Sequence, residues 1–471
     1  MRTFDLTPAE RAVYNRYAGL ALPRHTSYPT PPVWSDRFGP ADYRSALDRS
    51  RADRRPLSVY VHVPFCERLC YYCACTKEIV PAARRREADP SAAYLDGLAR
   101  EADRVADAVG GGEVQQVHLG GGTPTFLTPD GLERLWATVS SRFAVCPDAE
   151  IAVEIDPRVT TAEHLAALRG LGFNRVSLGV QDFDLKVQAA VNRVQSFEAV
   201  ETAVLRCREL GFDSVNFDLI YGLPYQTPES MAATLNKVLA LEPDRVAFYR
   251  LALIPEMFRW QSAFRRADLP DGESALALNL LAVNRFLGAG YEFVGLDHFA
   301  KPTEALAAAT RDRTIRRTFQ GMTTGRGLDV LGLGPSAISL LDDAFAQNLK
   351  ESGPWREAVG RDLATHRGLK LSADDRLRRE LLQELYGSGA IDTDTFGEAH
   401  GVEFADVFAD ELRRLRELEA DGLVELSETG LRLTPVLGRL LVRVVAAVFD
   451  IYLPPDAYRE GLPSHLASRV G

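Results

Sequence analysis

The sequence predicts an α/β protein built on a parallel sheet, followed by a smaller and mostly helical C-terminal domain. From Leu57 onward, short β-branched runs alternate with amphipathic helical segments, which is typical of parallel strands joined by right-handed helical crossovers. Polar and glycine-rich residues stand where successive strands end. Around Gly353 and Pro354 the alternation stops, and helical patterns dominate the remaining chain.

The strands and helices of the predicted sheet follow one another between residues 57 and 300. The strands are LSVYVHVP, VQQVHLGG, EIAVEIDP, RVSLGVQ, DSVNFDLIYG, RVAFYRLALIP and FVGLDHFA. Helical segments near residues 92–108, 128–142 and 161–170 follow the first three strands. About six to eight βα units fit this length, enough for an open or a closed barrel.

Two flanking regions complete the predicted organisation. Residues 1–55 are polar and punctuated by proline, and RHTSYPTPPVW, from Arg24 to Trp34, is an extended segment. Residues 56–353 hold the βα units. Residues 354–471 form the C-terminal domain, which we expect to be winged-helix-like because a hairpin-like stretch, LVELSETGLRLT, precedes its last helix.

Composition limits the classes of function. The formal net charge is −10 and the sequence pI is about 5.5, so no basic face for nucleic acid is expected. No apolar run reaches membrane-spanning length, and the N-terminus lacks the apolar stretch of a signal peptide. Six cysteines in 471 residues without such a signal argue against a disulfide framework. We therefore expect a cytoplasmic protein with reduced thiols.

Four cysteines fall between residues 66 and 75, and the first three have the spacing C-x3-C-x2-C. A structural zinc site normally uses two separated pairs of ligands, and no second pair exists. Three thiolates, from Cys66, Cys70 and Cys73, can hold a [4Fe–4S] cluster and leave one iron open to a small molecule, whereas four thiolates close the cluster. Cys75 lies too close to Cys73 to wrap around the same cluster, so we expect it nearby as a non-ligand.

Polar residues at the ends of successive strands form the rest of the candidate site. They are Gly120, Gly121, Gly122, Thr123 and Pro124 after the second strand, Glu154 and Asp156 on the third, Gln181 and Asp182 on the fourth, Asp218 on the fifth, and His298 after a later strand. Because ligands of parallel βα folds bind at this edge of the sheet, we expect one shared site. His298 fits a core role or a catalytic role equally well, and His62 and His118 are interpreted as structural.

CERLCYYC and GGGTP, one βα unit apart, resemble the cluster and cofactor motifs of the radical S-adenosylmethionine (SAM) superfamily. The resemblance implies that the methionyl amine and carboxylate of SAM bind the open iron. It further implies that an electron from the cluster cleaves SAM to a 5′-deoxyadenosyl radical, which abstracts hydrogen from an unactivated C–H bond. An electron donor such as flavodoxin or ferredoxin would then be required.

A narrower resemblance extends from about residue 15 to the C-terminus. RHTSYPT, YVHVPFCERLCYYCACTK, HLGGGTPTFL, GFNRVSLGVQDF, FDLIYGLPYQTPES, GLDHFAKP and TFQGMTT are similar to the oxygen-independent coproporphyrinogen III oxidase family. The resemblance implies a partial (βα)6 barrel that binds two SAM molecules, with the N-terminal segment covering the active site. The residues implied for the first SAM are Tyr60, Gly121, Gly122, Thr123, Glu154, Gln181, Arg193 and Asp218, and those implied for the second are Phe319, Gln320 and Ile338.

Physical roles can be expected for several of these residues. Tyr60 can pack on the adenine, while Glu154 and Asp218 can accept hydrogen bonds from the ammonium or the ribose hydroxyls. Arg193 can pair with a carboxylate through two hydrogen bonds. Tyr60 and Arg24, the latter in the covering segment, are the candidates for catalytic roles.

The match departs from the family where a substrate would lie. The family carries Tyr-Ala-His-Leu/Val-Pro after the sixth strand, whereas this chain has Leu251-Ala252-Leu253-Ile254-Pro255, preceded by Arg250. Two leucines in place of a Tyr and a His would make a pocket more apolar and remove orienting hydrogen bonds. A tetrapyrrole with four carboxylate arms should not favour that change.

Three functions remain open from the sequence. The favoured one is a class C radical SAM reaction, in which a methylene group from the second SAM methylates or cyclopropanates an sp² carbon of an aromatic natural-product intermediate. A partner methyltransferase could complete that reaction. The alternative is oxidative decarboxylation of coproporphyrinogen III in haem biosynthesis. The third is a haem-binding or trafficking protein without turnover.

Overall fold

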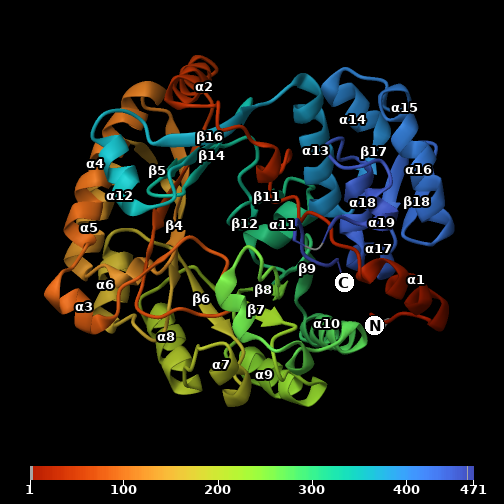
Figure 1. Ribbon diagram of the computed structural model, residues 1–471, viewed down its shortest axis with the longest axis horizontal. Coiled ribbons are helices and arrows are strands. Elements are labelled where there is room, and N and C mark those ends of the chain that lie inside the picture. Colours follow the sequence, from red (N-terminus) through yellow and green to blue (C-terminus); the bar gives the residue numbers. More distant parts are fainter. Residues whose placement is uncertain (1–3, 464, 471) are drawn as a thin grey trace.

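The structure, a computed structural model, describes residues 4–463 and 465–470. At its centre six neighbouring strands run parallel in sequence order (Figure 1). They are β1 (Leu57–Val63), β4 (Glu113–Gly121), β5 (Ala144–Ile155), β6 (Arg175–Gln181), β7 (Ser214–Tyr221) and β8 (Arg245–Arg250). The prediction of a partial barrel of six βα units is confirmed.

Helices connect these strands and cover the outside of the sheet (Figure 1). They are α4 (Ser91–Val109), α5 (Pro129–Ser140), α6 (Ala162–Gly170), α7 (Leu185–Ala190), α8 (Phe197–Glu209), α9 (Pro228–Ala240) and α10 (Gly272–Gly288). Several begin at a side-chain cap: Thr128 accepts from the Gly131 amide, and Asp271 accepts from that of Ser274. The three helices predicted near 92–108, 128–142 and 161–170 correspond to α4, α5 and α6.

The sheet continues past the barrel on both sides to twelve strands. Beyond β1 lie β13 (Asp329–Leu333), which is parallel to β1, and the antiparallel β14 (Ile338–Leu340), β15 (Ala344–Asn348) and β16 (Thr365–Lys370). Beyond β8 lie β10 (His298–Ala300) and β9 (Glu292–Val294), both antiparallel to their neighbours. The expectation of one continuous strand over FVGLDHFA is wrong, because the chain turns at Gly295, whose φ is +61°.

Short elements fill the remaining connections around the barrel mouth. They are β2 (Phe65–Cys66), β3 (Glu78–Ile79), α3 (Ala82–Glu87), η2 (Pro124–Phe126), η3 (Arg259–Ala263), η4 (Arg266–Asp268), α11 (Ala305–Arg311), β11 (Arg316–Thr318), β12 (Gly321–Thr323) and α12 (Ser352–Val359). The hairpin of β11 and β12 contributes several residues to the wall of the central cavity.

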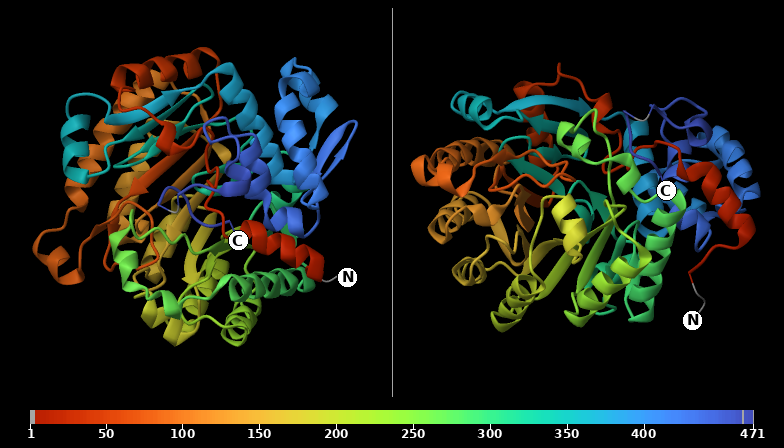
Figure 2. Two further views of the ribbon diagram at one scale, coloured as in Figure 1. Left: turned by 45° about the vertical axis from the view of Figure 1, so that its right-hand side comes forward. Right: turned by 60° about the horizontal axis from the view of Figure 1, so that its bottom comes forward.

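The N-terminal region bridges the two halves of the molecule. It contains α1 (Pro8–Ala18), η1 (Pro31–Val33) and α2 (Pro40–Ala52). Helix α2 packs beside α4 on the barrel, whereas α1 lies against the C-terminal domain (Figures 1 and 2). The segment between them holds buried His25, whose ring nitrogens lie 3.0 Å from the Tyr386 hydroxyl and 3.0 Å from an Asp450 carboxylate oxygen. The covering segment is therefore anchored to the C-terminal domain.

The C-terminal domain is mostly helical, as predicted. Its elements are α13 (Ala373–Ser388), β17 (Ala390–Asp392), α14 (Thr393–His400), α15 (Phe404–Val407), α16 (Ala409–Ala420), β18 (Val424–Ser427), β19 (Gly430–Leu433), α17 (Leu437–Leu440), α18 (Val442–Val448) and α19 (Ala457–Glu460). The hairpin-like stretch forms β18 and β19, and β17 adds a third strand. Because the large sheet runs on to Lys370, we propose the domain boundary near residue 371 rather than at 353.

Within the described residues, no helix combines the length and the apolar character needed to cross a membrane.

Candidate active site

The cysteine loop lies between β2 and β3 at the mouth of the barrel. The parallel pairing of these two strands closes the base of the loop, and the Val80 amide donates to the Cys66 carbonyl at 2.9 Å. Cys66, Cys70 and Cys73 are all free thiols; Cys70 is buried and the other two are half-buried. Cys66 Sγ also lies 3.6 Å from Thr123 Oγ1, so the cysteine loop touches the glycine-rich loop as the motif spacing predicted.

The thiols differ in their surroundings. Burial raises the pKa of Cys66 to about 12. A hydrogen bond with Cys75 lowers the pKa of Cys73 to about 6, and Lys77 adds to that effect. Across residues 4–463 and 465–470, no three His, Cys, Asp or Glu side chains are grouped to hold a single metal ion. The donor set itself, three soft thiols on one short loop, fits an iron–sulfur cluster.

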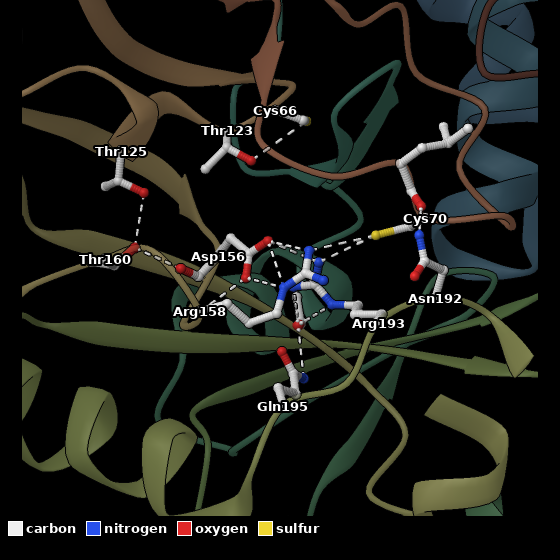
Figure 3. A network of polar contacts seen from close by, with 12 residues as sticks. Cys66, Cys70, Thr123, Thr125, Asp156, Arg158, Thr160, Asn192, Arg193 and Gln195 are labelled. Carbon is white, nitrogen blue, oxygen red and sulfur yellow. Dashed lines mark hydrogen bonds and ion pairs between the residues drawn. The ribbon is translucent and has the colours of Figure 1, made fainter. Parts of the chain in front are cut away.

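Two guanidinium groups point at Cys70 (Figure 3). Arg158 Nη2 and Arg193 Nη1 lie 3.6 and 3.7 Å from its sulfur. Both are held by Asp156, which accepts from Arg158 Nη2 at 2.6 Å and from Arg193 Nη1 at 3.1 Å. Arg193 also donates through Nε to the Gly179 carbonyl at 3.1 Å. In this arrangement Arg193 faces a cysteine thiol and a carboxylate of the chain itself.

The Asp156 carboxylate is the electrostatic centre of this network. Burial by itself would raise its pKa, but Arg193 and Arg158 outweigh burial and hold the pKa at about 2. The side chain is 7% exposed, so the network is largely shielded from water. The sequence indicated Asp156 and Arg193 as site residues but not Arg158. Arg158 could have been found from its position two residues after Asp156, a carboxylate at the end of a strand.

The glycine-rich loop is shaped by close backbone approach to the cysteine loop. Gly121 has a φ of +107°, and a Cβ there would lie 2.6 Å from the His62 ring. A Cβ on Gly122 would lie 2.7 Å from the Phe65 carbonyl oxygen, and the Thr123 amide donates to that same oxygen at 2.8 Å. Side chains at these two glycines would therefore push the two loops apart.

A cavity of about 490 Å³ lies inside the barrel, and its lining runs from the beginnings of the strands, at Ser58 and Arg245, to Glu154 and Asp218 further along them. Tyr60 and His118, which are paired in register on β1 and β4, line it, and their rings stack with centroids 5.8 Å apart. His118 Nε2 lies 3.1 Å from Glu154 Oε1, and Glu154 Oε2 accepts from the Gly121 amide at 3.2 Å. His118, which was interpreted from the sequence as structural, thus lines the cavity. Its pairing in register with Tyr60 could have revealed this position.

Asp218 faces the same cavity from β7. Its carboxylate accepts from Ser177 Oγ at 3.1 Å and from Asn216 Nδ2 at 3.0 Å. Burial, reinforced by the nearby Glu154 charge, raises the pKa of Asp218 to about 6. Two carboxyl groups therefore stand in one pocket and are suited to accept hydrogen bonds from a cationic or hydroxylated ligand.

Gln181 and Asp182 end β6 in different surroundings. Gln181 adopts the left-handed region with a φ of +66°, next to a bulge in the pairing of β6 with β7; such backbone outliers are concentrated at functional sites. Asp182 is 1% exposed and accepts from Gln226 Nε2 at 2.6 Å and Thr234 Oγ1 at 2.7 Å. Asp182 consequently has a structural role rather than a place in the site.

Two of the residues implied for a second SAM lie in the wall of the same cavity as Tyr60. Phe319 and Gln320 line the cavity from the turn between β11 and β12. Phe319 packs against Trp34 with centroids 6.1 Å apart, and Ile338 on β14 packs on the same apolar cluster. The structure brings Phe319 and Ile338 together, and it adds Trp34 of the N-terminal segment to them.

His298 and Arg24 occupy neighbouring positions near the C-terminal domain. His298 lines the large cavity, with Nδ1 2.8 Å from Asp297 Oδ1 and Nε2 3.3 Å from the Tyr249 hydroxyl. Arg24 lines a separate small cavity instead, and its Nη2 donates to the Arg250 carbonyl at 2.7 Å.

The expected leucine wall of the substrate pocket is wrong. Leu251 is 8% exposed and packs in an apolar cluster with Val187 and Leu223, against which Tyr72 of the cysteine loop also packs. Leu253 is 37% exposed at the surface. Neither leucine is among the described residues that line the large cavity. That expectation rested on the resemblance to the family's motif after the sixth strand, and in this chain β8 ends at Arg250, directly before these positions.

The chain was compared with families and with curated proteins. The model of the Radical SAM superfamily matches residues 60–238, and that of the HemN C-terminal domain matches residues 371–441. Oxygen-independent coproporphyrinogen III oxidase of Escherichia coli is 42% identical over 94% of this chain and 95% of the relative. The protein of the same name from Synechocystis is 39% identical over 96% and 97%.

One solved structure matches over nearly the whole chain. It is described as coproporphyrinogen III oxidase (HemN) from Escherichia coli, a radical SAM enzyme, and aligns with a TM-score of 0.88 and 39% identity over 96% of this chain and all of that one. These relatives contradict the favoured expectation of methyl or methylene transfer, since proteins of distant bacteria that match end to end carry the oxidase name. The physical argument for methylene transfer also fails, because it depended on the leucine wall.

Proposed function

Because the chain belongs to the oxygen-independent coproporphyrinogen III oxidase family and is a radical SAM enzyme, we propose that it converts coproporphyrinogen III to protoporphyrinogen IX. The observation that supports this proposal is that the chain matches the relatives over nearly its whole length. Identity of 42% over 94% of the chain includes the barrel, the covering segment and the C-terminal domain.

The family binds a [4Fe–4S] cluster and SAM, and the chain offers side chains that fit both. Cys66, Cys70 and Cys73 would hold the cluster. When bound, the reduced cluster and SAM supply a carbon radical that takes hydrogen from the propionate β-carbon, after which carbon dioxide and one electron leave and a vinyl group remains. Arg158 and Arg193 would place positive charge beside the Cys70 sulfur and so balance part of the negative charge of the ligated cluster.

The residues of the large cavity would orient the small molecules. Glu154 and Asp218 present two carboxyl groups for ammonium and hydroxyl donors, while the Tyr60 ring offers an apolar face for an adenine. Phe319 and Gln320, which line the same cavity, would contact a second SAM molecule. Thr26 and Ser27 of the covering segment also line the cavity, which places protein rather than bulk water over the reacting groups.

Partners and location follow from the same chemistry. We propose that a one-electron donor such as flavodoxin or ferredoxin docks beside the cysteine loop, inside the reducing cytoplasm. Helix α3 contributes positive charge to this surface, because Arg84 and Arg86 are exposed on it. Arg85 places the helix beside the cysteine loop: its guanidinium lies 4.1 Å from the centre of the Phe126 ring, and its Nη1 lies 3.9 Å from Oε1 of Glu67, the neighbour of Cys66. An acidic donor would complement this local positive charge. We expect no nucleic-acid or membrane partner.

The proposed reaction is tested by anaerobic turnover of the iron-loaded protein with dithionite, coproporphyrinogen III and methyl-deuterated SAM. We expect vinyl-bearing porphyrinogen, detected after oxidation by fluorescence and mass spectrometry, together with unlabelled 5′-deoxyadenosine. A Cys66→Ser variant serves as the control that should form neither product. Deuterated 5′-deoxyadenosine without vinyl product, or tight haem binding without SAM cleavage, would contradict the proposal.

A further inference from the structure

The second half of the cysteine loop is held by the segment that follows β8. Trp260 on η3 donates through Nε1 to the Cys73 carbonyl at 2.9 Å. Its neighbour Gln261, which is buried, donates through Nε2 to the Tyr72 carbonyl at 3.4 Å. A proposed cluster ligand and the residue before it therefore present their backbone oxygens to donors from a distant part of the chain.

Lys77 brings a positive charge to the same place. Its Nζ donates to the Cys73 carbonyl at 3.3 Å and to the Cys75 carbonyl at 3.1 Å. The ammonium also lies 3.9 Å from the centre of the Trp260 ring, within the range of a cation–π contact. These partners are two carbonyls and an indole ring, all of them neutral, so none cancels the charge of the ammonium.

The two arginines beside Cys70 have a different balance of charge. Both pair with the Asp156 carboxylate, at 2.6 and 3.1 Å, so one anion offsets part of their charge. The contacts of Lys77 with the described residues include no carboxylate. Within that part of the chain, Lys77 acts on Cys73 with its charge unopposed at contact distance.

Positive charge at this position would favour one oxidation state of a cluster. Three thiolates outweigh the charge of an oxidised [4Fe–4S] core, so the assembly is already an anion, and reduction adds a further electron. A nearby cation stabilises the reduced form more than the oxidised form and so raises the reduction potential. The N–H dipole of Trp260, whose positive end points at the Cys73 carbonyl, acts in the same direction.

We propose that Lys77 and Trp260 form a positive cap on Cys73 that raises the reduction potential of the cluster and so eases its reduction by the electron donor. Both residues act on the cluster through one of its ligands, so they are positioning residues rather than catalytic ones. The inference depends on the cluster that the family binds and not on the substrate that the enzyme converts.

The test is a measurement of the reduction potential of the iron-loaded protein, made anaerobically without SAM or substrate and followed by the EPR signal of the reduced cluster. Lys77→Met removes the charge and keeps an unbranched side chain. The ratio of reduced to oxidised cluster at a given potential should fall about tenfold, which for one electron is a shift of about 59 mV to lower potential. Lys77→Arg keeps the charge and should restore most of that shift.

The matched control is Lys186→Met. Lys186 is exposed on α7, and its ammonium lies 4.2 Å from the centre of the Tyr225 ring. The control therefore removes one positive charge and one contact between a lysine and an aromatic ring, as Lys77→Met does, but at a position away from Cys73. Its reduction potential should match that of wild type.

Iron and sulfide per chain are measured first, so that potentials are compared only between loaded proteins. An unchanged potential in Lys77→Met would overturn the proposal. Should that variant fail to keep iron, Trp260→Leu removes both the indole N–H and the ring beneath the ammonium. Its potential should also fall, and an unchanged value would overturn the proposal. Since no substrate is present, failure to convert coproporphyrinogen III would refute the proposed function without affecting this result.

Discussion

Replacing Asp156 with asparagine tests whether the network around Cys70 is held by charge. The carboxylate has a pKa of about 2 in the folded chain against an ordinary value of 3.8. This difference corresponds to about 2.4 kcal/mol of stability, which is present above pH 3.8 and lost as the pH falls through 2. The variant would also leave Arg158 and Arg193 buried without their anion, and breaking a buried pair costs about 3–5 kcal/mol.

We therefore expect Asp156→Asn to lose about 2–5 kcal/mol at pH 7. For a chain of 471 residues, an unfolding entropy of about 2.1 cal/mol/K per residue gives about 1 kcal/mol/K, so the melting temperature should fall by about 2–5 °C. Anaerobic calorimetry of the iron-loaded protein measures this. Iron and sulfide per chain should fall as well, because both arginines that face Cys70 would lose their anchor.

The control is Asp148→Asn, which removes an exposed carboxylate of the same strand. It should melt within about 0.5 °C of wild type, since exposed charges contribute little. If Asp156→Asn also melted with wild type and kept its full iron content, the argument that Asp156 organises the two arginines would be refuted.

Three further predictions concern other positions. Burial raises the pKa of Glu101 on α4 from 4.5 to about 8. Between these two pH values the folded chain keeps a proton on Glu101 that the unfolded chain has released. The free energy of unfolding should therefore fall by about 2–3 kcal/mol from pH 6 to pH 9. Glu101→Gln should flatten this dependence in calorimetry, and parallel pH profiles of the two proteins would contradict the assignment. Gly122→Ala should lower the iron content because its Cβ would meet the Phe65 carbonyl. Gly170→Ala, which has open space around it, is the control and should keep the wild-type iron content. Equal iron content in both variants would show that the two loops can move apart without losing the cluster. Cys75→Ser should keep iron and sulfide at wild-type levels in elemental analysis, and their loss would make Cys75 a ligand.

Much of the fold could be predicted because hydrophobic periodicity is local. The alternation of β-branched runs with amphipathic segments marked all six parallel strands, and three of the residues expected at one site, Glu154, Asp218 and His298, line one cavity. The turn at Gly295 was missed because a glycine within an apolar run is compatible with a continuous strand as well as with a hairpin.

Side-chain direction was harder to predict than element type. Leu251 and Leu253 were expected to face the substrate because they stand in place of the family's Tyr and His, but they follow the end of β8, where strand periodicity no longer fixes the direction of a side chain. His118 was undervalued for a related reason, since its role depends on its register with Tyr60 in a neighbouring strand.

The anchoring of the covering segment to the far end of the chain affects the order in which the enzyme is made. Arg443 binds the Pro23 carbonyl across 420 residues of sequence, and the Val470 amide donates to the Leu20 carbonyl. At a synthesis rate of about 5–20 residues per second, the segment waits about 20–80 seconds for these partners to leave the ribosome. During that interval the cysteine loop has been synthesised but the mouth of the barrel cannot close. The nascent chain thus has a period of open access in which iron and sulfide can reach the three thiols before the two ends of the polypeptide lock together.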